Sequence, residues 1–343
     1  MKDITEELRG KLGFGCMRLP MTDGNVDTQE FSRMVDAYLA AGFDYFDTAH
    51  GYLEGKSELA LRECLTARYP RDRYFLVDKL SGSFLNKAED VVPFFENQLN
   101  ACGVKYFDLY LMHSQSAQVF EKFKKLRCYE TVLGLKEQGK LRHFGISFHD
   151  TPQVLEQILT EYPQIEVVQL QLNYLDWEMQ DAKQQYEIVT NYGAPVWVME
   201  PCRGGRLASL TPEADKLLTD CNPDRSVASW AFRYVMSLPN VGVILSGMTQ
   251  MDQAENNVAT FSEGKNLTEQ EQAVLSQALE QFRSQVIVPC TACHYCDGCP
   301  MELEIPDILK LYNRYSLNHS PMIHMDVAEL SHGPSDCIGC GAC

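Results

Sequence analysis

Four polar residues recur in the sequence at intervals that suit one strand and one helix, and a tyrosine follows the first of them. The four close short apolar runs, with gaps of 32, 34 and 34 residues between them: Asp47, Lys79, His113 and Ser147. Tyr52 follows Asp47 by five residues. Because this repeat fits the strand–helix unit of a parallel barrel, we expect the strand ends to meet at one rim. Barrel enzymes build their active sites at that rim.

These residue types can deliver a proton to an oxygen that gains negative charge. The phenol of Tyr52 has an ordinary pKa of about 10, and a nearby ammonium such as Lys79 should lower that pKa. Asp47 can neutralise a buried Lys79, and His113 can donate a hydrogen bond that orients a carbonyl oxygen. A single such residue is more often structural, so the prediction rests on the joint pattern. The sequence predicts a catalytic set of four in which Tyr52 is the general acid.

The elements that would position these residues alternate between short apolar runs and longer amphipathic stretches. Runs such as Val241–Leu245 are nearly continuously apolar, as strands buried on both faces require. Eight such units predict an α/β fold, a (β/α)8 TIM barrel over residues 1–285. The first strand–helix turn lacks GxGxxG, which argues against an open, doubly wound sheet as the alternative. The expected strands are Leu12–Met17, Phe43–Asp47, Tyr74–Lys79, Asp108–His113, His143–Ser147, Val167–Gln171, Pro195–Glu200 and Val241–Ser246.

Several of the expected helices have recognisable beginnings. Asp27 and Thr268 each stand three residues before a glutamate, which is a capping-box pattern. Thr151 and Thr211 each precede a proline, which places a capping hydroxyl before the first helical position. These signals predict helices that begin directly after each of the four residues.

Motifs of characteristic composition run through the first 285 residues. They are KLGFGCMRLP (Lys11–Pro20), FDYFDTAHGYLEGKSE (Phe43–Glu58), VDKL (Val77–Leu80), DLYLMHS (Asp108–Ser114), EQGKLRHFGIS (Glu137–Ser147), VVQLQLNY (Val167–Tyr174), VMEPCRGGRL (Val198–Leu207) and ILSGMTQMDQAENN (Ile244–Asn257). Together they resemble the aldo-keto reductase family. The catalytic residues of that family fall, in order, on Asp47, Tyr52, Lys79 and His113. The resemblance implies a barrel that binds NADP(H) across its rim and reduces an aldehyde or ketone by hydride transfer.

The same resemblance implies a set of cofactor contacts. Ser147 and Gln169 would hold the nicotinamide carboxamide, and Met199 would cover the ring. The loop after the last strand would take the phosphate end of the adenosine, and the following helix the adenine: Ser246, Gly247, Met248 and Thr249, then Gln253, Asn256 and Asn257. The basic residues that usually hold the 2′-phosphate are replaced by Ser246 and Asp252. NADP(H) is the expected cofactor, and NAD(H) remains an open alternative.

Cysteines mark a second region, because seven of the thirteen lie between residues 290 and 343. They form one C-x2-C-x2-C-x2-C run and one C-x2-C-x2-C run: Cys290, Cys293, Cys296 and Cys299, then Cys337, Cys340 and Cys343. This spacing is close to that of bacterial ferredoxins and favours [4Fe-4S] clusters over zinc or inert thiols. The resemblance here is to reductases with a ferredoxin-like segment that holds two clusters.

We therefore expect an iron–sulfur segment over residues 286–343, with one short helix near Asp307–Tyr315. In two-cluster ferredoxins the fourth cysteine of each run serves the other cluster. Cys299 would then complete the second run, while the first run would lack a ligand. The expectation is a truncated segment with one complete site and one three-cysteine site.

Composition limits the partners and leaves one alternative function open. A net charge of −17 at pH 7 argues against nucleic acid and against an anionic membrane surface. The polar first ten residues predict no signal peptide, and the other cysteines are scattered as in a reducing compartment, so we expect a cytoplasmic protein. Its expected partners are a small carbonyl substrate and a redox protein. The alternative is a redox-sensing or electron-transfer module in which the barrel binds nicotinamide with little turnover.

Overall fold

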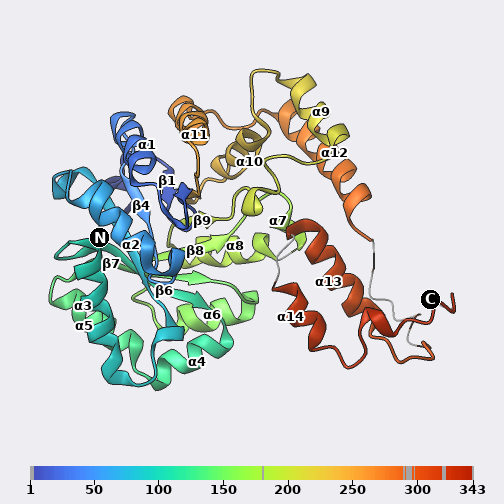
Figure 1. The fold of residues 1–343 in the computed structure, drawn as a ribbon, viewed down its shortest axis with the longest axis horizontal. Coiled ribbons are helices and arrows are strands. Elements are labelled where there is room, and N and C mark those ends of the chain that lie inside the picture. The colour runs from blue at the N-terminus through green and yellow to red at the C-terminus, as the bar shows by residue number, and fades with distance from the viewer. Residues whose placement is uncertain are drawn as a thin grey trace. The chain divides into compact units, whose positions relative to one another are not determined.

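Eight parallel strands form a closed barrel (Figure 1). The computed structural model describes residues 4–179, 181–288, 290, 296, 298–318 and 322–341. Neighbouring strands follow the order β1-β10-β9-β8-β7-β6-β5-β4 around the barrel, which confirms the predicted TIM-barrel fold. The strands are β1 (Leu12–Gly15), β4 (Tyr45–Asp47), β5 (Phe75–Leu80), β6 (Phe107–Gln115), β7 (Leu141–Phe148), β8 (Val167–Gln171), β9 (Val196–Met199) and β10 (Val241–Ser246).

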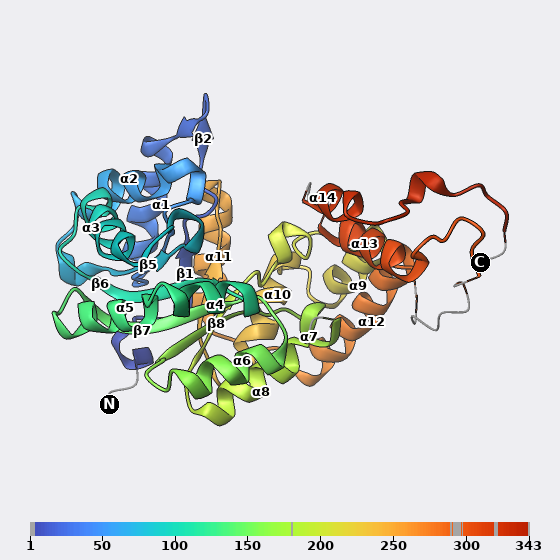
Figure 2. The same ribbon diagram turned by 90° about the horizontal axis from the view of Figure 1, so that it is seen from below.

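The chain divides into two compact units, residues 1–202 with 231–267 and residues 203–230 with 268–343. In the barrel unit, helices surround the strands (Figure 2). They are α1 (Thr28–Ala40), α2 (Lys56–Leu61), α3 (Val91–Cys102), α4 (Ala117–Lys125), α5 (Cys128–Glu137), α6 (Pro152–Glu161), α7 (Asp176–Met179), α8 (Ala182–Tyr192) and α11 (Met251–Glu263). The second unit holds α9 (Pro212–Cys221), α12 (Glu269–Val286), α13 (Ile305–Asn318) and α14 (Ile323–Ala328), and α10 (Val227–Met236) spans the division. The boundary predicted at residue 285 stays a prediction.

The helices begin directly after all four predicted residues, and three of these residues cap their helix through the side chain. Asp27 accepts a hydrogen bond from the third residue of α1, and Thr268 forms a complete capping box with Glu271. Thr211 caps α9 through its hydroxyl. The helix α6 begins at Pro152 as expected, but the Thr151 side chain makes no capping hydrogen bond within the described chain.

A short hairpin and a helix in the second unit were not predicted. The strands β2 (Met21–Thr22) and β3 (Asn25–Val26) pair as a small antiparallel hairpin after β1. In the second unit, α13 is longer than the helix expected there, and α14 follows it.

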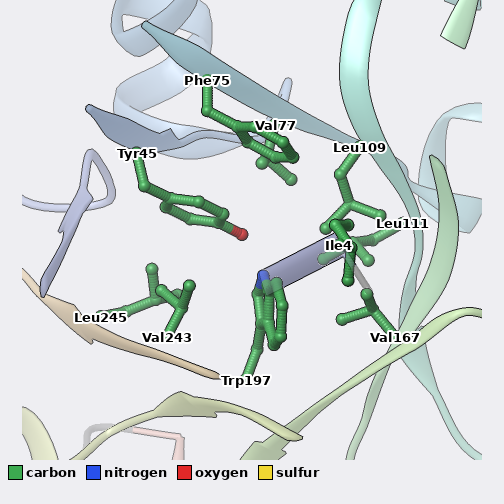
Figure 3. Close-up of a cluster of buried hydrophobic side chains, with 10 residues drawn as sticks. All are labelled: Ile4, Tyr45, Phe75, Val77, Leu109, Leu111, Val167, Trp197, Val243 and Leu245. Carbon is green, nitrogen blue, oxygen red and sulfur yellow. The ribbon is translucent and has the colours of Figure 1, made fainter. Parts of the chain in front are cut away.

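Large apolar side chains fill the interior of the barrel (Figure 3). Tyr45 from β4 and Trp197 from β9 point toward each other across this interior, and Ile4 enters it from the 3₁₀ turn Ile4–Glu7. Strands β5, β6, β8 and β10 supply the remaining members: Phe75, Val77, Leu109, Leu111, Val167, Val243 and Leu245. Because the interior is packed, a ligand site must lie at a rim. Among the helices that the structure describes, none is both long and apolar enough to cross a membrane.

Candidate active site

Three neighbouring strands bring a carboxylate, an ammonium and an imidazole to the carboxyl-terminal rim of the barrel. Asp47 is the last residue of β4, Lys79 lies one residue before the end of β5, and His113 lies near the end of β6. Tyr52 begins the 3₁₀ turn Tyr52–Gly55 in the loop after β4. The structure thus brings together the four residues singled out by their spacing in the sequence.

Lys79 connects Asp47 with Tyr52. Its Nζ lies 2.5 Å from Asp47 Oδ1, 2.7 Å from the carbonyl oxygen of Thr48 and 3.2 Å from Tyr52 Oη. Burial lowers the pKa of Lys79, but the charge of Asp47, together with the hydrogen bonds to Asp47 and Tyr52, raises that pKa further than burial lowers it. Burial also raises the pKa of Asp47, and the ammonium opposes that rise. Lys79 is therefore an ammonium whose three donors are all used.

Tyr52 keeps its proton at neutral pH. Burial raises the pKa of its phenol above the ordinary value, and the charge of Lys79 counteracts this rise without reversing it. The predicted lowering of the Tyr52 pKa is therefore wrong for this structure, because desolvation of the phenolate outweighs the attraction of the ammonium. A protonated phenol beside a fixed ammonium is the form that a general acid needs.

The backbone at His113 is irregular and well anchored. The register between β6 and β7 shifts after Met112, and Ser114 adopts a left-handed φ of 51°. The Ser114 amide donates to Ser147 Oγ at 2.8 Å, and the Gln115 side chain donates to the His113 carbonyl at 3.1 Å. Such a bulge re-aims a side chain at the end of a strand. The His113 ring consequently stands edge-on to Tyr52, with ring centroids 6.0 Å apart.

Ser81 is a polar neighbour of His113 that sequence reasoning missed. Its Oγ lies 2.7 Å from His113 Nδ1. Burial and then the charge of Lys79 lower the pKa of His113 to about 3, so the imidazole is neutral. The sequence could have indicated Ser81, because it follows Lys79 by two residues. Side chains two residues apart in a strand point to the same side, so Ser81 would be expected near the same rim.

Ser147 and Gln169, expected at the carboxamide, lie opposite each other on β7 and β8. Both side chains are buried. Gln169 Oε1 accepts no hydrogen bond from the residues that the structure describes. A buried, unpaired acceptor is costly unless a ligand pairs with it, and an amide N–H would do so. Met199, at the end of β9, keeps part of its side chain exposed.

The residues expected at the adenosine end lie at the end of β10 and on α11. Asn257 Nδ2 donates to Ser246 Oγ at 2.9 Å, and both residues are buried. The Thr249 amide donates to Gln253 Oε1 at 2.8 Å. Asn256 lies on the exposed side of α11. The loop is therefore already fixed by its own hydrogen bonds.

A cation that sequence reasoning did not single out stands beside this loop. A Cβ atom at Gly247 would lie 3.6 Å from the Cβ of Arg18 and 3.9 Å from its Nη1. Arg18 is about half exposed, and its Nη1 is 3.9 Å from Glu200 Oε1. The Met248 side chain is buried, so its backbone is the part that could contact a ligand.

Comparison with known proteins identifies the family. Residues 11–280 match the profile of the Aldo/keto reductase family. The chain belongs to this family. The NADH-specific methylglyoxal reductase of Escherichia coli (strain K12) is 24% identical over 309 residues, which cover 75% of this chain and 91% of that protein. This aldo/keto reductase is accordingly an oxidoreductase of an NAD(P)H-dependent family.

Solved structures of two aldo-keto reductases share the fold. The holo form of AKR11C1 from Bacillus halodurans superimposes with a TM-score of 0.63 at 24% identity, over 78% of this chain and 91% of that one. A Klebsiella pneumoniae aldo-keto reductase in complex with NADPH gives a TM-score of 0.63 at 19% identity, over 79% and 90% of the two chains.

The cysteine-rich segment of this aldo/keto reductase lies beyond the residues that match the family profile. Cys293 and Cys343 lie outside the described residues. Cys290 is exposed, while Cys296, Cys299, Cys337 and Cys340 line a cavity of about 480 Å³. Within the described parts of the chain, no three His, Cys, Asp or Glu side chains stand close enough to hold a single metal ion.

Proposed function

We propose that this aldo/keto reductase reduces an aldehyde or ketone to an alcohol, with Tyr52 as the general acid. The observation that carries the proposal is the single contact network in which Lys79 Nζ reaches both Asp47 and Tyr52. Bound NAD(P)H would supply a hydride to the carbonyl carbon. Tyr52 donates its proton to the carbonyl oxygen as negative charge develops there.

Lys79, Asp47 and His113 favour this proton transfer by stabilising the charges that develop during it. The Lys79 ammonium stabilises the phenolate that Tyr52 becomes, and Asp47 keeps Lys79 charged in a buried position. His113 is neutral, so it offers one N–H to the same carbonyl oxygen and does not compete as an acid. Two donors placed before the reaction lower the barrier without reorganisation during it.

For the cofactor, we propose that Ser147 and Gln169 hold the carboxamide and that Met199 covers the nicotinamide. Ser246, Gly247, Met248 and Thr249 would take the phosphate end, and Gln253, Asn256 and Asn257 the adenine. The unpaired Gln169 Oε1 supports the first part.

We further propose that the enzyme uses NADP(H) and also accepts NAD(H). Arg18 offers a cation beside Gly247, whereas Asp252 in the first turn of α11 would repel a 2′-phosphate. The E. coli relative is described as NADH-specific, and the Klebsiella structure holds NADPH. The test is kcat/KM with each cofactor, and a large preference for NADH would overturn the NADP(H) assignment.

The activity itself is tested with anaerobically prepared full-length protein and a panel of aldehydes, ketones and α-dicarbonyls. The expected result is cofactor oxidation coupled to formation of the alcohol, quantified by mass spectrometry. Cofactor binding without turnover of any carbonyl compound would contradict the proposal and favour a redox-sensing or electron-transfer module instead.

We also propose that residues 286–343 form a ferredoxin-like segment. Cys299 would join Cys337, Cys340 and Cys343 in one [4Fe-4S] site. Cys299, Cys337 and Cys340 line one cavity together with Cys296, so thiols of both runs lie around it. The spacing of the cysteines in the sequence is what assigns Cys299 to the second run. The other run, Cys290, Cys293 and Cys296, would supply three ligands to a second site. A redox protein is the partner that such clusters would serve.

Iron and acid-labile sulfide, quantified per chain after anaerobic preparation, test the cluster proposal. Cys337→Ser is expected to remove the iron of the complete site. Cys221→Ser, on α9 and outside both cysteine runs, is the matched control and should leave the iron content unchanged. Wild-type protein that contains zinc in place of iron and sulfide would contradict the proposal.

A further inference from the structure

A short hydrogen bond joins His113 to a residue outside the proposed catalytic set. Ser81 follows β5 directly, is 6% exposed, and places its Oγ 2.7 Å from His113 Nδ1. Resting on the proposed function, we propose that Ser81 is a positioning residue that holds His113 in the tautomer with its proton on Nε2. His113 can then donate that N–H to the carbonyl oxygen of the substrate.

The direction of this hydrogen bond follows from the needs of the serine hydroxyl. Among the described residues, His113 Nδ1 is the one group within hydrogen-bonding distance of Ser81 Oγ. If Nδ1 carried the proton and donated it, the buried O–H of Ser81 would have no acceptor. Buried hydroxyls pair their proton, because an unpaired one loses the hydrogen bond it had with water. Ser81 therefore donates, and Nδ1 accepts.

The consequence for His113 follows from its charge. Burial and the neighbouring Lys79 keep the imidazole neutral by lowering its pKa to about 3, so only one of its two nitrogens carries a proton. An acceptor at Nδ1 leaves that proton on Nε2. In the opposite tautomer, Nε2 would present a lone pair to an oxygen that is gaining negative charge, which is repulsive.

The backbone that carries His113 is fixed without the help of Ser81. The Gln115 side chain donates to the His113 carbonyl and accepts from the hydroxyl of Tyr129 at 2.8 Å. The next amide, that of Ser114, donates to Ser147. Removal of the Ser81 hydroxyl should therefore alter the proton distribution on the ring more than the position of the ring.

The experiment combines nitrogen NMR with kinetics on the full-length chain. Two-bond ¹H–¹⁵N spectra report which imidazole nitrogen carries the proton, and the His113 signals are those lost in His113→Gln. In the wild type we expect an unprotonated Nδ1 and a protonated Nε2. Ser81→Ala should give a mixture of tautomers and a fall in kcat/KM of about tenfold, the effect of one lost hydrogen bond.

Two further variants separate this role from a merely structural one. Ser81→Thr retains the hydroxyl and should restore the single tautomer and most of the activity that Ser81→Ala loses. Ser83→Ala removes an exposed hydroxyl from the same turn and should change neither readout.

A protonated Nδ1 in the wild type would overturn the assignment. So would a Ser81→Ala protein with the wild-type tautomer and wild-type kcat/KM. If the wild type reduces no carbonyl compound, the proposed function fails, while the nitrogen spectra still support or overturn the tautomer on their own.

Discussion

Replacing Lys79 with methionine is expected to lower the free energy of unfolding by about 3–5 kcal/mol, because it leaves a buried charge without its partner. Lys79 is 1% exposed and Asp47 2% exposed, so water cannot take the place of the ammonium. The substitution also removes the donor to the carbonyl oxygen of Thr48. For a unit of this size, such a loss corresponds to a fall in Tm of about 10 °C.

Urea unfolding followed by tryptophan fluorescence measures this loss, since Trp197 is buried in the barrel interior. The deficit of Lys79→Met should grow as the pH rises. Without the ammonium, burial alone acts on Asp47 and raises its pKa in the folded state further above that of the unfolded chain. A carboxyl with a raised folded pKa contributes stability below its unfolded pKa, of about 3.9, and loses it as the pH rises through the folded value.

Two controls isolate the ion pair. The double variant Asp47→Asn with Lys79→Met removes both charges and should recover much of the loss. Lys216→Met breaks an exposed pair with Asp220 and should cost less than about 1 kcal/mol. A Lys79→Met protein no less stable than Lys216→Met would refute the reasoning.

Three further outcomes can be measured directly. Burial, with the charge of nearby Glu58, raises the pKa of Asp78 well above its ordinary value. The stability of the wild type should therefore fall, relative to Asp78→Asn, by up to about 1.4 kcal/mol per pH unit above pH 4; parallel stability–pH curves would contradict this. Gly145→Ala should destabilise the barrel by about 1–3 kcal/mol or more, since its Cβ would lie 2.6 Å from the Val167 carbonyl oxygen. Gly134→Ala, in an open helical position, should instead stabilise by about 0.5–1 kcal/mol, and equal Tm shifts would count against the packing argument. Because the pKa of His113 is lowered to about 3, protonation of this group should not decrease kcat/KM between pH 7 and 5. A decrease over this range that is absent in His113→Gln would contradict this expectation.

The barrel and the meeting of the four residues could be predicted from the sequence, because both depend on a period. Strands buried on both faces are nearly continuous apolar runs, and polar residues at their ends recur at one strand–helix unit. Strand bounds moved by only a few residues. The extension of β6 to Gln115 includes a bulge that no local sequence pattern predicts.

Features that depend on burial or on distant contacts could not be predicted. Proximity to Lys79 suggests a lowered pKa for Tyr52, but burial of the phenol raises that pKa by more, and this burial depends on residues from several elements of the rim. The pairing of Ser81 with His113 joins the residue after β5 to the end of β6, 32 positions apart. Arg18 is brought beside Gly247 only by the pairing of β1 with β10.

Single-turnover hydride transfer in Tyr52→Phe tests the central claim most directly. Phenylalanine keeps the aromatic ring but removes the proton that the mechanism requires. The affinity for NADPH should be unchanged, while the rate of hydride transfer to a carbonyl substrate falls by about a hundredfold to ten-thousandfold. Tyr192→Phe, which removes a hydroxyl on α8 that donates to the Ile165 carbonyl, is the matched control and should keep the wild-type rate. A Tyr52→Phe enzyme that transfers hydride as fast as Tyr192→Phe would contradict the assignment of Tyr52 as the general acid.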